Sequence, residues 1–75
     1  MPYFTSTAEL NAMVARVAPT ILELLADGTP RTKAAVVAAL AGRHAAEDVG
    51  LALVRLAVTG RLVEAGGRYT LGETA

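Results

Sequence analysis

A chain of 75 residues has room for one small domain, which excludes a multidomain enzyme that carries its own cofactor-binding fold. Seven basic and seven acidic residues give a formal net charge of zero, so a strong bulk attraction to nucleic acid is not expected. The absence of cysteine from the sequence excludes disulfides, thiolate catalysis and zinc sites built on sulfur.

The first predicted helix begins near residue 7. The run Ser6-Thr7-Ala8-Glu9 has the form of a capping box, which satisfies backbone donors at a helix start. The apolar residues that follow have the i, i+3, i+4, i+7 spacing of one helical face: Leu10, Met13, Val14 and Val17. Pro19 predicts a break or a kink, because its ring clashes with the preceding turn and it lacks an N–H donor. A strongly apolar segment, 21–25, follows and is ended by Asp27-Gly28.

Two more helices are predicted in the middle of the chain. Residues 30–31 look extended, and Thr32 is a suitable N-cap for a helix that runs to about Ala41. After the turn at 42–44, another helix is expected over about 45–59, and Gly60 ends it.

The C-terminal part of the sequence changes from a helical to a strand pattern. Residues 62–65 and 68–71 are rich in strand formers, and Gly66-Gly67 between them is a signal for a two-residue hairpin turn. We expect residues 72–75 to fray. The prediction is therefore one domain made of a helical extension (1–18), a core (19–71) and a short tail (72–75).

This order of elements resembles a winged helix-turn-helix domain. The likeness extends from Ile21 to Leu71, and the run from Gly60 to Leu71 is similar to the small winged helix at the end of bacterial DNA-processing protein A and to many bacterial repressors. The resemblance implies a mainly α fold with a small β-hairpin wing and, here, an extra N-terminal helix. In that family the helix after the tight turn enters the major groove, the helix before it touches phosphate, and the wing lies along the DNA backbone or minor groove.

The resemblance also implies a set of DNA contacts, which are Thr32, Lys33, Arg43, His44, Arg55, Arg61 and Arg68. The segment 31–68 holds six basic and three acidic residues, a balance of +3, whereas 1–30 holds one basic and three acidic residues, a balance of −2. Such segregation fits a DNA-facing half of the molecule. The competing interpretation is that these are ordinary solvated surface charges.

The predicted recognition helix has an apolar outer side. At about 100° per residue, Leu51, Val54 and Val58 lie together with Glu47, opposite a second apolar set formed by Val49, Leu53 and Leu56. Base edges are read mainly by polar side chains, so we expect only modest direct readout, with Arg55 on the flank as the one credible base or phosphate contact. Three alternatives remain open for the outer stripe: helix 7–17 covers it, a second copy or another protein binds it, or it inserts into DNA.

Two functions follow from these patterns. The first is a small, dimeric, DNA-associated protein, a transcriptional regulator or DNA-processing accessory that binds duplex DNA mainly through phosphates. The second is a protein-interaction winged helix that does not bind DNA. Its interface would be the stripe of Leu51, Val54 and Val58 or the first-helix stripe of Leu10, Met13 and Val17.

Enzyme activity is not expected. His44 is the only histidine and Ser6 the only serine, so no nucleophile and base arrangement is evident, and we expect no metal, cofactor or small-molecule substrate. No run approaches the about 20 apolar residues of a membrane span, and the N-terminus lacks signal-peptide features. Six arginines against one lysine and abundant alanine are typical of a GC-rich bacterial genome. We therefore expect a cytoplasmic bacterial protein without a membrane partner.

Overall fold

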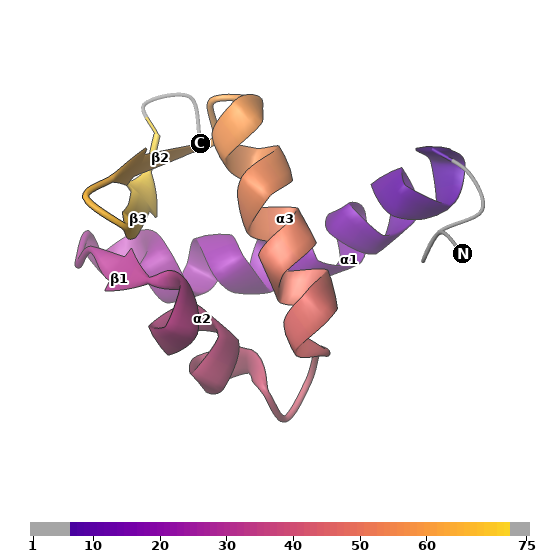
Figure 1. Ribbon diagram of the computed structural model, residues 1–75, viewed down its shortest axis with the longest axis horizontal. Helices are drawn as coiled ribbons and strands as arrows, with labels where there is room; N and C mark the ends of the chain where they lie inside the picture. Colours follow the sequence, from indigo (N-terminus) through magenta and orange to yellow (C-terminus); the bar gives the residue numbers. More distant parts are fainter. Residues whose placement is uncertain (1–6, 73–75) are drawn as a thin grey trace.

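The computed structural model describes residues 7–72 (Figure 1). Its helices are α1 (Thr7–Leu24), α2 (Lys33–Leu40) and α3 (Ala46–Val58), and a 3-10 turn, η1 (Leu25–Asp27), follows α1. Its strands are β1 (Arg31–Thr32), β2 (Leu62–Ala65) and β3 (Arg68–Leu71), which form one antiparallel sheet in the order β1-β3-β2. The described part is thus mainly helical with a small sheet, as predicted, and is compatible with a winged-helix-like arrangement.

α1 is one continuous helix, so of the break or kink predicted at Pro19 the break does not occur, and in Figure 1 the N-terminal part of α1 runs at an angle to the rest of the helix. Proline removes the hydrogen bond to the carbonyl of Ala15, and both residues lie on the exposed side of α1, where water can satisfy that carbonyl. On the other side, Val17 and Ala18 before the proline and Ile21 after it are buried, and their packing anchors both halves of the helix to the core. None of the helices described is long and apolar enough to cross a membrane.

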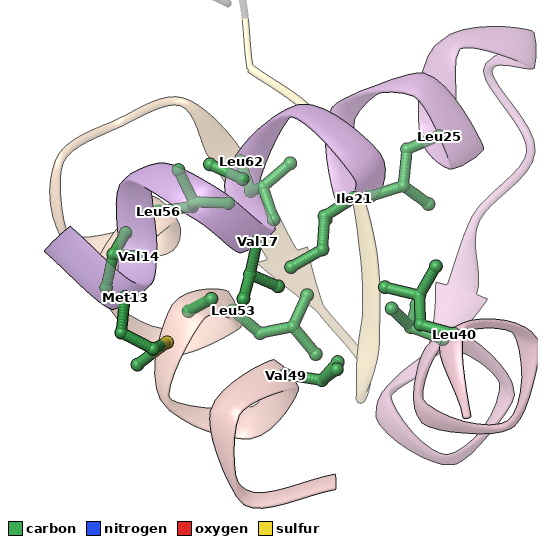
Figure 2. Packing of buried hydrophobic residues seen from close by; sticks show 13 residues of the cluster. Met13, Val14, Val17, Ile21, Leu25, Leu40, Val49, Leu53, Leu56 and Leu62 are labelled. Atoms are coloured by element: carbon green, nitrogen blue, oxygen red, sulfur yellow. The ribbon is translucent and has the colours of Figure 1, made fainter. Parts of the chain in front are cut away.

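The core lies where α1 and α3 cross. Figure 2 shows Leu53 and Val49 of α3 directed toward Val17 and Ile21 of α1. The whole buried cluster consists of Met13, Val14, Val17, Ala18, Ile21, Leu25, Val36, Leu40, Val49, Ala52, Leu53, Leu56 and Leu62. It contains no polar or charged residue, so packing of apolar side chains is what holds the helices together.

The helix ends follow the predicted chemistry. The Thr32 hydroxyl accepts a hydrogen bond from the Ala35 N–H (3.1 Å) and caps α2. Gly28 and Gly60 have positive φ values of 78° and 83°, which glycine adopts without the steric cost that other residues meet. The Ser6 part of the predicted capping box lies outside the described residues.

The predicted hairpin is present, and a third strand joins it. Gly66 and Gly67 have φ values of 60° and 79°, and the Gly67 N–H donates to the Glu64 carboxylate (2.8 Å). On its other edge, β3 pairs with β1, which places Arg31 opposite Tyr69. The pairing with β1 was not predicted, because a two-residue strand has no periodicity to read. It ties the start of α2 to the hairpin.

Gly72 departs from the predicted fraying of residues 72–75. Its N–H donates to the Arg61 carbonyl (2.8 Å), and a Cβ at this position would collide with the Gly60 carbonyl oxygen. The chain is therefore held against the α3–β2 connection as far as Gly72. Residues 73–75 lie outside the described part.

Candidate interaction surface

The outer face of α3, defined here as Glu47, Leu51, Val54 and Val58, is open to solvent. The exposed fractions of the three apolar residues are 40% for Leu51, 57% for Val54 and 77% for Val58. This result contradicts the alternative in which helix 7–17 covers the stripe. α1 packs instead against the opposite side of α3, where Leu53 and Leu56 are buried.

The apolar stripe of the first helix, Leu10, Met13 and Val17, packs against the core of the same chain. Met13 and Val17 are both 1% exposed, and Leu10 is half-buried against the same core. The hypothesis that this stripe binds another protein is therefore corrected: these side chains stabilise the crossing of α1 and α3. In Figure 1, α3 crosses in front of α1, so the side of α3 that faces away from α1 is the one left uncovered.

A groove between α2 and α3 extends the exposed apolar surface. Its lining, taken from two adjoining hollows, comprises Lys33, Ala34, Val37, Ala46, Glu47, Gly50, Leu51 and Val54. Gly50 has no side chain to fill this groove, and a Cβ there would lie 3.2 Å from Lys33 Cε. The stem of Lys33 therefore runs across α3 at Gly50, and Lys33 and Glu47 are the charged residues of the lining.

Arg55 is directed toward α1 and not along the outer face. Its guanidinium Nη2 donates to Asn11 Oδ1 at 2.7 Å, which links α3 to the N-terminal half of α1. In this arrangement the Arg55 side chain is engaged with α1, and its expected role as a base or phosphate contact stays a prediction. Asn11 was missed by sequence reasoning, because a partner 44 positions away leaves no local signal.

The turn between α2 and α3 also faces α1. His44 Nε2 lies 3.5 Å from Thr20 Oγ1, and Arg43 lines a shallow hollow together with Thr20 and Glu23 of α1. Of these two predicted DNA contacts, Arg43 therefore borders a hollow between α1 and the end of α2, and His44 lies beside Thr20 of α1.

The remaining basic residues do not gather in one patch. Arg61 and Arg68 are exposed, and their side chains make no hydrogen bond or ion pair with the described residues. Figure 1 shows that the α2–α3 turn, the α3–β2 connection and the β2–β3 turn lie at three separate edges of the molecule. The three segments that carry the predicted DNA contacts at 43, 61 and 68 are thus separate parts of the backbone, and their common use in DNA binding stays a prediction.

Arg31 is the remaining basic residue of the segment 31–68, and it forms an ion pair with Asp27. Its Nη2 lies 2.9 Å from Asp27 Oδ2, and the other carboxylate oxygen accepts from the Thr29 N–H (2.9 Å). These contacts hold the pKa of Asp27 below its ordinary value, the backbone hydrogen bond from Thr29 being the largest cause. The Asp27 and Arg31 pair thus fixes the entry of the chain into β1.

Comparisons with protein-family models, with curated proteins and with solved structures find no match to this chain. The site must therefore be judged from its own chemistry. An exposed apolar stripe on a small domain is typical of a surface that binds another protein. Among the surfaces of residues 7–72, the outer face of α3 with its adjoining groove has this character most clearly.

Proposed function

We propose that the chain is a winged helix-turn-helix domain that acts as a protein-interaction module, with the outer face of α3 as its binding surface. The fold assignment is supported by the order of α2, tight turn, α3 and hairpin, and by the pairing of β1 with β3. α1 is then an added N-terminal helix that completes the core.

The observation that carries the proposed function is the exposure of Leu51, Val54 and Val58 on the helix that a DNA-binding relative would place in the major groove. A groove-reading helix presents polar side chains to base edges, and aliphatic side chains contact little there except thymine methyl groups. Covering apolar surface with a partner is favourable by about 25 cal/mol for each Å² removed from water. The same residues thus weaken base readout and favour association with a protein.

Site-specific photo-crosslinking in cells that naturally make the protein tests this function. A photoreactive amino acid replaces Val54 in one variant and Val63 in a matched control. Val63 is also an exposed valine, at 50%, but it lies on β2 away from the outer face. We expect protein adducts from position 54 and none from position 63. Equal adducts from both positions, or none from position 54, would contradict the proposal.

A second function, binding of duplex DNA through phosphates, is favoured by one observation. Arg61 comes just before β2 and Arg68 is the first residue of β3, and both are exposed with side chains that have no partner among the described residues. Arginines in this state can exchange water for phosphate oxygens without breaking an internal ion pair. This mode would give little sequence preference, because phosphates carry no sequence information.

Fluorescence anisotropy with a labelled duplex at a series of salt concentrations tests the second function. Removing one arginine that binds a phosphate should reduce the slope of log affinity against log salt by about 1. We expect that reduction for Arg61→Ala and for Arg68→Ala, and no change for Arg16→Ala, which removes an exposed arginine of α1. Absence of binding at low salt would remove this candidate.

A further inference from the structure

The outer face of α3 has the spacing of a helix-pairing seam. Glu47, Leu51, Val54 and Val58 are separated by four, three and four residues, the alternation that keeps a and d positions of a heptad on one side of a helix. The seam is open where Leu51, Val54 and Val58 are exposed. A second helix laid along α3 would bury these three side chains together.

The two ends of α3 carry opposite charges. Glu47 and Asp48 lie in the first turn, Arg55 lies in the last turn, and Arg61 comes just after the helix. The sequence has no other charged residue from 47 to 61. Two such helices side by side attract each other when they run antiparallel, because Glu47 of each then lies toward Arg61 of the other. Lys33 of α2 borders the same groove as Glu47 and reduces this attraction, and Arg55 is directed toward Asn11 and takes no part in it. In parallel orientation, like charges would meet at both ends and repel.

We propose that the partner of the outer face is a second copy of this chain, docked with the two α3 helices antiparallel about a twofold axis between Leu51 and Val54. This proposal rests on the proposed interaction function and names its partner. Leu51 packs against the partner's Val54, and Glu47 lies beside the partner's Val58 and within reach of the partner's Arg61. The twofold axis repeats each contact, so the surface is complementary to itself.

The size of the outer face determines how tightly two copies of the chain can be expected to bind. Specific stable interfaces bury about 800 Å² on each partner, and smaller ones belong to weak or transient complexes. One helix face with three exposed aliphatic residues is at the small end of that range. The dimer should therefore dissociate with a micromolar constant.

Sedimentation equilibrium of the full chain over micromolar to millimolar concentrations tests the pairing. We expect a monomer–dimer equilibrium that Val54→Glu abolishes while the circular dichroism spectrum stays unchanged, because Val54 is not part of the core. Val63→Glu makes the same change on β2 and should leave the dimer intact. A wild-type chain that is monomeric throughout would overturn the proposal, as would equal weakening by both substitutions.

Charge reversal tests the antiparallel orientation. Glu47→Arg and Arg61→Glu each replace two attractive contacts of the dimer by repulsive ones. Since two exposed attractive contacts are lost and two repulsive ones are formed, each change should weaken the dimer at least about fivefold. The double variant restores complementary ends and should regain wild-type affinity. A double variant as weak as, or weaker than, the single variants would overturn the antiparallel arrangement.

Binding of a protein at the outer face and pairing of two copies of the chain can be tested separately. A monomeric chain whose position 54 still forms adducts with a different protein overturns self-pairing and leaves the interaction function standing. A monomeric chain with no adduct at position 54 overturns both. An adduct between two copies of the chain, formed only from position 54, supports both.

Discussion

At the scale of single residues, two glycines outside the positive φ region have opposite surroundings. Gly72 is packed against the backbone of the α3–β2 connection, where an added Cβ would collide with the Gly60 carbonyl oxygen and lie 3.2 Å from the Arg61 carbonyl. Gly42, in the turn after α2, has no atom within 4 Å of an added Cβ. Their substitution by alanine should therefore have effects of opposite sign.

We predict that Gly72→Ala lowers the free energy of unfolding by about 1–3 kcal/mol, because backbone atoms cannot move aside as a flexible side chain would. Gly42→Ala is the matched control and should raise it by about 0.4–1 kcal/mol, since alanine restricts the unfolded chain. Urea unfolding followed by circular dichroism measures both. A Gly72→Ala variant as stable as the wild type would show that the packing around Gly72 is loose.

Asp27 gives a prediction about pH. Its folded-state pKa lies below the ordinary value of 3.8, first because the Thr29 N–H donates to it and then because Arg31 is adjacent. A lowered pKa means that the ionised carboxylate stabilises the folded chain above pH 3.8. That contribution is lost as the pH falls through the lowered pKa.

The variant Asp27→Asn keeps an acceptor for the Thr29 N–H and loses the charge. It should be less stable than the wild type at neutral pH, and the difference should vanish at a pH well below 3.8. Thermal unfolding of both proteins at neutral and acidic pH measures this difference. A difference that is the same at both pH values would mean that the charge of Asp27 has no part in stability.

At the scale of elements, α1 shows how burial of one face can outweigh a local breaker. The exposed Pro19 interrupts only the solvent side of the hydrogen-bond ladder, while Val17 and Ile21 anchor the buried side to the core. The helix therefore continues through Pro19, although it lacks the hydrogen bond to the Ala15 carbonyl and contains a residue of low helix propensity. A residue that restores both should stabilise α1 without altering the core.

We predict that Pro19→Ala raises the free energy of unfolding by about 1–3 kcal/mol, because alanine supplies the missing N–H and has the best helix propensity. Urea unfolding measures the change. Ala15→Ser is a suitable control: it is also exposed on α1, and it should cost only a few tenths of a kcal/mol. A decrease in stability of Pro19→Ala would mean that the fixed φ of proline favours the native chain more than the missing hydrogen bond disfavours it.

At the scale of the whole molecule, one apolar face of α3 is buried and the other is exposed to solvent. The inner surface is buried against α1, α2 and β2 and contributes Val49, Ala52, Leu53 and Leu56 to the small core. The outer surface finds no cover within residues 7–72. A chain of this size buries little apolar surface on folding, so covering the outer face in a dimer would add to the stability of each copy.

If the proposed dimer forms, the unfolding temperature should depend on protein concentration, because mass action favours the folded dimer. We expect a rise of roughly 2–5 °C for each tenfold increase in concentration. Val54→Glu should remove the dependence without lowering the value at high dilution. Differential scanning calorimetry at several concentrations measures it. A wild-type unfolding temperature that is independent of concentration would contradict association.

Local sequence patterns were enough to predict α2, α3, the Thr32 cap and the hairpin, although they divided α1 at Pro19. These features depend on residues that are neighbours along the chain, such as the Thr32 cap and the Gly66-Gly67 turn, and on the spacing that makes each helix amphipathic. The spacing also identified the outer stripe of α3 correctly as a separate face.

Which apolar face is buried, and which side chains meet, follows from contacts between elements that are distant in the sequence. The tertiary structure placed α1 on the inner side of α3, turned Arg55 toward Asn11, added β1 to the hairpin and fixed Gly72. The reason is that periodicity describes one helix at a time, whereas burial depends on the total surface that distant elements remove from water together. Contacts between residues as far apart as 11 and 55 have no local pattern from which to predict them.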